Sequence, residues 1–174
     1  MNPMLLTLIR YQTWADAAFF DKLALVDSRR HEAEYRTALA LLDHIHVVAQ
    51  IFAAHLAGRP HAFRSDTSDP TPPIDALREA TAQTNQWYLD YAGTLREEAL
   101  AERIAFTFTD GDRGCLSREE MLMHVLLHGA VHRGEVGRIL SGIGASIPWD
   151  TFAVFLHQSE PARREAVPAL RLSA

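Results

Sequence analysis

Three histidines stand four residues apart in the stretch His124-Val125-Leu126-Leu127-His128-Gly129-Ala130-Val131-His132-Arg133-Gly134-Glu135. An α-helix turns by about 100° per residue, so each step of four residues advances only about 40° around the axis and neighbouring imidazoles share one face. The chain has nine histidines among 174 residues. Three in this register should arise in only about 0.02 random chains of the same composition. The run therefore predicts a helix that offers two imidazole nitrogens to one metal ion.

The residues on either side of this run indicate where its helix begins and ends. Ser117-Arg118-Glu119-Glu120 has the pattern of a capping box, in which a serine hydroxyl and a glutamate carboxylate bond free amides at a helix start. Gly142-Ile143-Gly144 favours termination. The peptidase motif H-E-x-x-H is absent, because Val125 rather than glutamate follows the first histidine. We therefore expect a long helix without a zinc-peptidase site.

Two further amphipathic helices are expected in the N-terminal part of the chain. Asn2-Pro3 is a helix-start signal, and apolar residues then recur at helical spacing as far as Leu25. The polar segment Asp27–Arg30 should separate this helix from a second one through Ala38–Leu56. Gly58-Arg59-Pro60 contains the stop signals for that second helix.

The middle and the end of the chain contain a long loop and shorter elements. Residues 59–73 are rich in Pro, Ser, Asp and Thr without periodicity, which predicts a loop before a third long helix over Pro73–Leu95. Ile104–Thr109 alternates with period two and meets Asp110-Gly111, which is typical of a hairpin. Trp149–Leu156 predicts a short last helix.

These elements together favour a helical bundle. Four long amphipathic helices can bury their apolar stripes only against one another. We therefore expect an all-α four-helix bundle, with a short hairpin before the fourth long helix and a short C-terminal helix after it. A chain of 174 residues is most simply one domain over residues 1–174, in which residues from about 160 to 174 form a loose tail.

Composition limits the partners and the compartment. The net charge of −5 argues against a nucleic-acid partner, for which a basic face is expected. The single Cys115 excludes an intramolecular disulfide and fits a reducing cytoplasm, and we expect an inert thiol there. No stretch approaches the roughly 18 apolar residues that span a bilayer, and the N-terminus lacks a secretory signal pattern. We expect a cytoplasmic protein without a membrane partner.

The second helix contains another candidate metal ligand, His44. It shares a helical face with Leu41, Val48 and Ile51, so its side chain should point into the bundle. His46 lies about 160° further round the axis, so the two histidines cannot serve one ion from a regular helix. The apolar neighbours favour His44, because a buried imidazole needs a partner for its nitrogens.

The other histidines outside the run stand in polar or terminal contexts, and we expect ordinary roles for His31, His55, His61 and His157. His55 faces a similar way to His44 but lies about 16 Å further along the helix, too far to share its ion.

Three elements of the chain, in order, resemble the signatures of the DinB family. They are Tyr11-Gln12-Thr13-Trp14-Ala15, Leu42-Asp43-His44-Ile45 and the run from His124 to Gly134. They resemble a Y-x-x-W-A element, an L-x-H-I element and an H-x-x-x-H-x-x-x-H-R-G-Q element, of which the last is rather specific. The resemblance covers most of the chain.

This resemblance implies an antiparallel four-helix bundle, often homodimeric, that holds a divalent metal through three histidines. Carried over position by position, the metal ligands are His44, His128 and His132, and His124 becomes a structural residue or one that supports a ligand. Related members include bacillithiol and mycothiol S-transferases and a thiol-dependent isomerase, while many members have no assigned activity.

One departure from the family pattern concerns Glu135, which stands where the family usually has glutamine. It is three residues beyond His132 and seven beyond His128, hence on the ligand face. Four roles remain open from the sequence: a fourth ligand, a proton acceptor, a partner that orients an imidazole, or an exposed glutamate that makes only a salt link.

Three neutral imidazoles leave coordination positions open for water or substrate, as catalytic zinc sites do, and all-imidazole ligation suits zinc or nickel. Our first hypothesis is a metal-dependent enzyme on small molecules, of the thiol S-transferase or hydrolase type, with a low-molecular-weight thiol as a candidate substrate. The competing hypothesis is a non-catalytic metal-binding or stress-response protein in which the ion ties two helices together.

Overall fold

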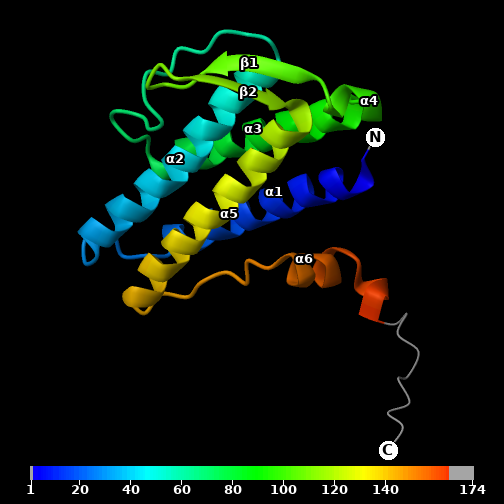
Figure 1. The fold of residues 1–174 in the computed structure, drawn as a ribbon. Helices are drawn as coiled ribbons and strands as arrows, with labels where there is room; N and C mark the ends of the chain where they lie inside the picture. The colour runs from blue at the N-terminus through cyan, green and yellow to red at the C-terminus, as the bar shows by residue number, and fades with distance from the viewer. Residues whose placement is uncertain (1, 165–174) are drawn as a thin grey trace, which may run out of the picture.

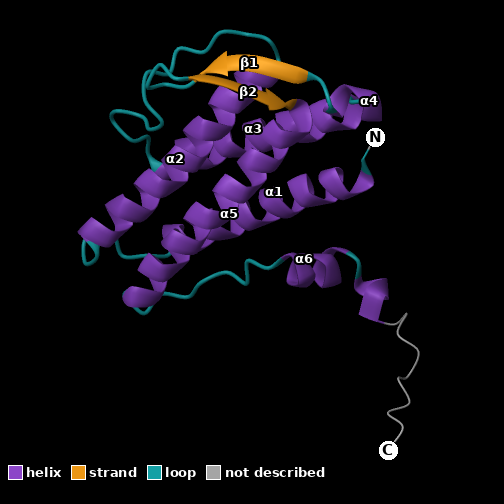
Figure 2. Ribbon diagram, viewed as in Figure 1, coloured by secondary structure: helices purple, strands orange, loops and turns teal. Residues whose placement is uncertain are grey.

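The structure is a computed structural model that describes residues 2–164. Four long helices account for most of it (Figure 1): α1 (Pro3–Ala24), α2 (Glu32–Leu56), α3 (Ile74–Thr94) and α5 (Arg118–Gly142). Shorter elements are α4 (Glu97–Leu100), β1 (Arg103–Thr107), β2 (Arg113–Ser117), α6 (Phe152–Ser159) and the 3₁₀ turn η1 (Pro161–Arg164). The fold is therefore mostly helical with one small antiparallel hairpin (Figure 2).

The four long helices contact one another in a closed sequence of neighbours. Helix α1 packs against α3 and α5, and α2 packs against the same two helices from the other side. Two apolar clusters fill the space between them. One cluster includes Ile9, Val48 and Val125, and the other includes Phe19 and Val136. The expected pattern of long helices that bury apolar faces against one another is present.

A buried polar layer separates the two apolar clusters. Among the described residues it comprises Gln12, Asp16, Thr81, Thr84, Asn85 and Arg133; the remaining buried polar side chain, Asp43, lies between Leu42 and Ile45 of a single cluster. On α1, Gln12 and Asp16 lie between Ile9 of one cluster and Phe19 of the other. On α5, Arg133 lies between Val125 and Val136 in the same way. Polar chemistry is thus concentrated at mid-height of the long helices.

The predicted helix ends agree with the structure at several places. The Asn2 side chain accepts hydrogen bonds from the amides of Met4 and Leu5. Ser117 and Glu120 form both halves of the capping box at the start of α5. Helix α2 begins at Glu32, well before Ala38. The turn that separates it from α1 is short, because the Asp27 side chain accepts hydrogen bonds from the amides of Arg29 and Arg30.

The hairpin lies across α2 and α5 and contacts both helices (Figure 2). Its strands pair with Phe106 opposite Gly114. The strand predicted to reach Thr109 ends at Thr107, because Phe108 and Asp112 close the turn through a backbone hydrogen bond of 2.8 Å. Gly111 in this turn has a φ of 97°, a conformation that favours glycine. The hairpin is therefore confirmed with a shorter first strand.

The C-terminal part differs slightly from the prediction. Helix α6 begins at Phe152 rather than Trp149, because the Thr151 side chain accepts the amide of Val154 and caps the helix there. Pro161–Arg164, at the start of the expected tail, forms a 3₁₀ turn. The remainder of the predicted tail, residues 165–174, lies outside the described residues.

Helix α2 is the one helix within residues 2–164 that is long and apolar enough to cross a membrane by length and composition. The sequence-based statement that no stretch approaches this limit was therefore too strict. More than half of the apolar window is buried inside the fold. A core helix meets the same criterion, so the finding does not by itself indicate a membrane span.

Gly114→Ala tests the packing of the hairpin. A Cβ at this position would lie 2.5 Å from the ring of Phe106, which is buried against Phe52 and must move. We expect the free energy of unfolding to fall by about 1–3 kcal/mol, as in other overpacked sites. Gly93→Ala in α3 is the control, because nothing lies within 4 Å of its Cβ and alanine favours helix. Equal stability of the two variants in urea denaturation would contradict this packing.

Candidate metal centre

Three histidines from two helices converge at one point of the fold. His44 comes from α2, and His128 and His132 come from α5. One ring nitrogen of each lies within 4.8 Å of the others, and all three side chains are partly buried. Nε2 of His44 and Nε2 of His128 are 3.0 Å apart. These are the three residues that the resemblance to the DinB family implied as ligands, and the structure brings them together.

The second nitrogen of His44 is fixed by the loop that follows α2. Nδ1 of His44 lies 2.8 Å from the backbone carbonyl of Asp66. A carbonyl only accepts hydrogen bonds, so Nδ1 carries the proton and Nε2 is left with its lone pair toward His128. A carboxylate oxygen of Asp66 is also 3.6 Å from Nδ1. The loop therefore selects the tautomer that can bind a metal through Nε2.

The neighbouring residue, Asp43, anchors this loop to α2. Its side chain is fully buried and accepts hydrogen bonds from the amide of Ser68 at 2.7 Å and from the hydroxyl of Ser68 at 2.8 Å. Asp43 thus holds the backbone that in turn orients His44. Sequence reasoning missed this role; the available signal was a carboxylate directly beside a histidine on an otherwise apolar helix.

Glu135, on the same helix as His132, bonds to Nδ1 of that histidine, just as the carbonyl of Asp66 bonds to Nδ1 of His44. Its Oε2 lies 2.8 Å from Nδ1 of His132, which leaves Nε2 of that ring free for a metal. The glutamate side chain is about half exposed. Among the roles left open by the sequence, this contact supports orientation of an imidazole.

His46 is absent from the cluster, as expected from its position on the helix. Its Nδ1 is buried without a hydrogen-bond partner among the described residues. Burial lowers the pKa of His46, and Asp43 opposes this shift. Of the two histidines, His44 is the one that lies with His128 and His132.

The histidine cluster opens onto a cavity of about 370 Å³ between α2, α5 and the hairpin. His44 and His128 form part of its wall. The remaining lining residues are Val48, Ile51, Phe52, His55, Asp66, Phe106, Phe108, Thr109, Asp110 and His124. The volume falls in the usual range of sites for small molecules. Cys115 is exposed on β2 and does not line this cavity.

Two histidines outside the cluster belong to the cavity wall. The ring centroid of His124 lies 4.6 Å from that of Phe52 and 5.5 Å from that of His128. The ring centroids of His55 and Phe106 are 5.0 Å apart. His55 was expected to play an ordinary role. His55 lies too far along α2 to join the cluster. The hairpin, however, covers both His55 and the cluster, so that His55, His44 and His128 line one cavity. No local pattern in the sequence reveals this.

The protonation of His128 suits metal binding. Burial, together with the neighbouring His132 and His44, lowers the pKa of His128 to about 4. Burial also lowers the pKa of His124. His128 is therefore a neutral imidazole at neutral pH, which is the form that binds metals. The geometry of the three rings, two of them held at Nδ1 by oxygen acceptors, fits a divalent metal ion.

A buried ion-pair network lies directly behind the cluster and is centred on Arg133. Its fully buried guanidinium donates to Asp16 at 3.0 Å and to Asp150 at 2.8 Å. Asn85 of α3 donates to the other oxygen of Asp16 at 2.9 Å. Burial raises the pKa of Asp16, and Arg133 opposes that shift. The arginine beside His132 therefore joins α5 to α1, to α3 and to the segment before α6.

Tyr11 completes this network. Its hydroxyl donates to Asp150, and burial together with this carboxylate raises the pKa of Tyr11 to about 12. The Y-x-x-W-A element on α1 and the H-R-G element on α5 thus meet in space through Arg133 and Asp150. The sequence contained both elements but did not show that they contact each other.

Comparison with protein families supports the resemblance seen in the sequence. The model of the DinB family matches residues 1–165. Searches of curated proteins and of solved structures found no match.

Asp16→Asn tests the energetic weight of the buried network. Removing the charge leaves the buried guanidinium without its main partner on α1, so we expect a loss of about 3–5 kcal/mol in the free energy of unfolding. Asp21→Asn on the same helix is the control, because Asp21 pairs with Arg78 in an exposed position worth less than about 1 kcal/mol. Similar effects of both variants in chemical denaturation would rule out a special role for Arg133–Asp16.

Glu135→Gln tests the orientation of His132. Glutamine retains an oxygen that can accept from Nδ1 but loses the charge that strengthens this hydrogen bond. We expect zinc affinity, measured by competition with a chromogenic chelator, to fall by about tenfold. Glu119→Gln on the same helix should leave the affinity unchanged, since Glu119 is exposed and distant from the cluster. Unchanged affinity in Glu135→Gln would show that the carboxylate has no part in the site.

Proposed function

Because this chain belongs to the DinB family, we propose that it is a metal-dependent enzyme that acts on a small molecule. The proposed ligands of the divalent ion, zinc or nickel, are His44, His128 and His132. The observation that carries this proposal is the position of two of the three clustered histidines, His44 and His128, in the wall of a cavity of about 370 Å³. A purely structural ion needs no such cavity beside it.

The chemistry of the cavity favours thiol transfer or hydrolysis. A divalent ion on three neutral imidazoles would supply a Lewis acid that favours the deprotonated form of a bound thiol or water. The chain itself supplies the ring nitrogens of His124 and His55 in the cavity wall as proton acceptors. Phe52, Phe106 and Phe108 provide apolar surface that holds the rest of a small substrate and limits the access of water. A low-molecular-weight thiol is the proposed cosubstrate.

A structural role for the ion is the alternative. Its ligands come from α2 and α5, so an ion would tie these two helices together. This alternative predicts a large fall in melting temperature on chelation and no turnover of any small molecule. The enzyme hypothesis predicts turnover that depends on the metal.

We further propose that the long helices form the antiparallel bundle of the family and that the protein is a cytoplasmic homodimer. The closed sequence of contacts among α1, α3, α2 and α5 supports the bundle. Leu127 and Val131 support a dimer, because these apolar side chains lie four residues apart on α5 and are more than 60% exposed. Sedimentation velocity tests this proposal, and a monomer at micromolar concentration would contradict it.

His128→Ala is the decisive variant for the enzyme hypothesis. We expect it to lose bound metal, measured by elemental analysis of the purified protein, and to lose metal-dependent transfer of a thiol to electrophilic probes. His46→Ala on α2 is the matched control and should retain the metal, since His46 lies outside the cluster. Full activity of metal-free His128→Ala would refute a metal-dependent reaction, and loss of metal in His46→Ala would refute the proposed ligand set.

A further inference from the structure

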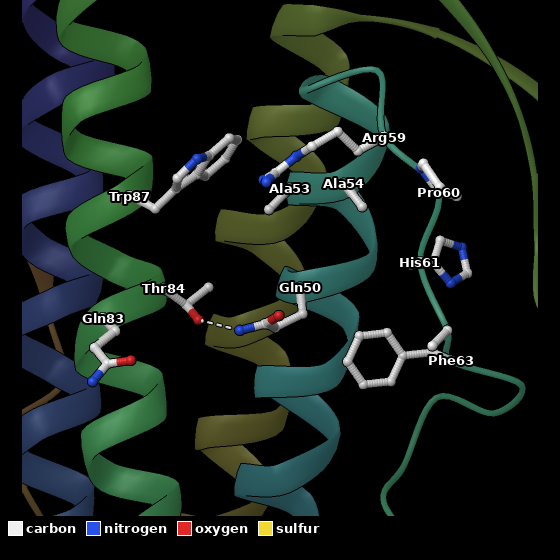
Figure 3. A pocket seen from close by; sticks show the side chains of 11 residues that line it. Gln50, Ala53, Ala54, Arg59, Pro60, His61, Phe63, Gln83, Thr84 and Trp87 are labelled. Carbon is white, nitrogen blue, oxygen red and sulfur yellow. Dashed lines mark hydrogen bonds between the residues drawn. The ribbon is translucent and has the colours of Figure 1, made fainter.

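A second cavity, of about 410 Å³, lies on another face of α2 (Figure 3). It is bounded by α2, by α3 and by the first residues of the loop after α2. Gln50 and Ala54 of α2 line it, whereas His44 and His55 line the cavity at the metal centre. The two linings share no residue. The second cavity is therefore a separate site.

Arg59 is placed in this cavity by the way α2 ends. The amide of Gly58 donates to the carbonyl of His55 and the amide of Arg59 donates to the carbonyl of Ala54, which is the Schellman pattern. Gly58 has a φ of 64°, which turns the chain back toward the helix. The Arg59 side chain then extends toward Trp87 on α3 (Figure 3). The stop signal seen in the sequence thus places an exposed arginine at the wall of this cavity.

The guanidinium of Arg59 makes no ion pair and no side-chain hydrogen bond within residues 2–164. No carboxylate lines the cavity either. Asp66 and Asp110, by contrast, line the cavity at the metal centre, which contains no lysine or arginine. Of these two cavities, the cavity at Arg59 is therefore the one suited to an anion.

The other walls provide a flat apolar surface and a fixed amide. Trp87 stacks on Tyr91 with ring centroids 4.9 Å apart and an interplanar angle of 15°, which holds the indole in one orientation. Gln50 donates to the Thr84 hydroxyl at 2.8 Å, and Thr84 in turn donates to the carbonyl of Ala80. The Gln50 amide is thus held in place, with its oxygen available as an acceptor (Figure 3). Such pre-ordered walls lower the entropic cost of binding.

We propose that this cavity binds a small aromatic carboxylate. The carboxylate pairs with the Arg59 guanidinium, whose planar fork matches two oxygens, and the aromatic ring packs against Trp87. Gln50 accepts from a hydroxyl or amine on the ring. The ligand class follows from the combination of one cation, one partly buried indole in the cavity wall and no opposing carboxylate.

Benzoate is the probe for this site, and the indole N–H signals of Trp14, Trp87 and Trp149 in ¹⁵N-labelled, metal-loaded protein are the readout. Trp87→Phe assigns the Trp87 signal. We expect benzoate to shift that signal at millimolar concentration and to leave the Trp149 signal in place. Benzamide and benzylamine have the same ring without the negative charge, and we expect at least about tenfold weaker binding of both. No shift of Trp87, or equal affinity for benzamide, would overturn the proposal.

Arg59→Gln and Arg64→Gln form the matched pair of variants, because Arg64 lies on the same loop but does not line the cavity. We expect Arg59→Gln to weaken benzoate binding by about tenfold or more and Arg64→Gln to change it by less than about twofold. Ala54→Leu should fill the cavity and abolish the shift in a protein that keeps its melting transition. Equal effects of the two arginine variants, or unchanged binding in Ala54→Leu, would contradict the site.

His128→Ala separates this site from the metal centre. A carboxylate that bound to the metal would lose its affinity in this variant, whereas benzoate at Arg59 keeps it. Retained binding in His128→Ala supports the proposal, and loss of binding in this variant, if it remains folded, would overturn it. The outcome does not depend on whether the protein is an enzyme.

Discussion

The burial of the Arg133 guanidinium is the constraint on which the arrangement of the helices depends. A buried cation is costly unless it is paired, and here Nη1 pairs with Asp16 of α1 and Nε with Asp150 of the segment before α6, while Nη2 has no partner among the described residues. These contacts fix the rotation of α5 about its own axis relative to α1. Since Arg133 directly follows His132, the same rotation directs the histidine face of α5 toward α2. The histidine cluster is thus oriented by an ion-pair network that includes none of the three clustered histidines.

This network also explains why the core is divided. Apolar clusters lie above and below a polar layer that includes Asp16, Asn85 and Arg133, and the three clustered histidines stand at the same height of α2 and α5. The two clusters bury apolar surface and so stabilise the fold. The polar layer between them fixes how far each helix is shifted along its neighbours, because its hydrogen bonds form in only one alignment of the helices. A slip of α5 by one turn would leave Arg133 and Asp16 buried and unpaired.

Much of the fold and the central histidines could be predicted from the sequence, because these features depend on local signals. Asn2 and Ser117 cap their helices through neighbouring amides, and the spacing of His128 and His132 places them on one helical face. The contacts of Arg133 with Asp16 and of Asp43 with Ser68 join residues far apart in the chain, and their side chains show no period. His55 likewise lines a cavity only because the hairpin, which lies far from it in the sequence, packs over it.

The loop after α2 illustrates how a segment without periodicity can be held in place by specific hydrogen bonds. Arg59 is bonded to α2 through its amide, and Ser68 is bonded to α2 through Asp43, so both ends of segment 59–68 are attached to the same helix. Between these attachments, Arg59 lines one cavity and the carbonyl of Asp66 orients His44 beside the other. The rings of His61 and His55, one from each lining, lie 5.1 Å apart. A single short segment of chain therefore shapes both cavities, and any change in its position acts on the tautomer and the direction of a proposed metal ligand.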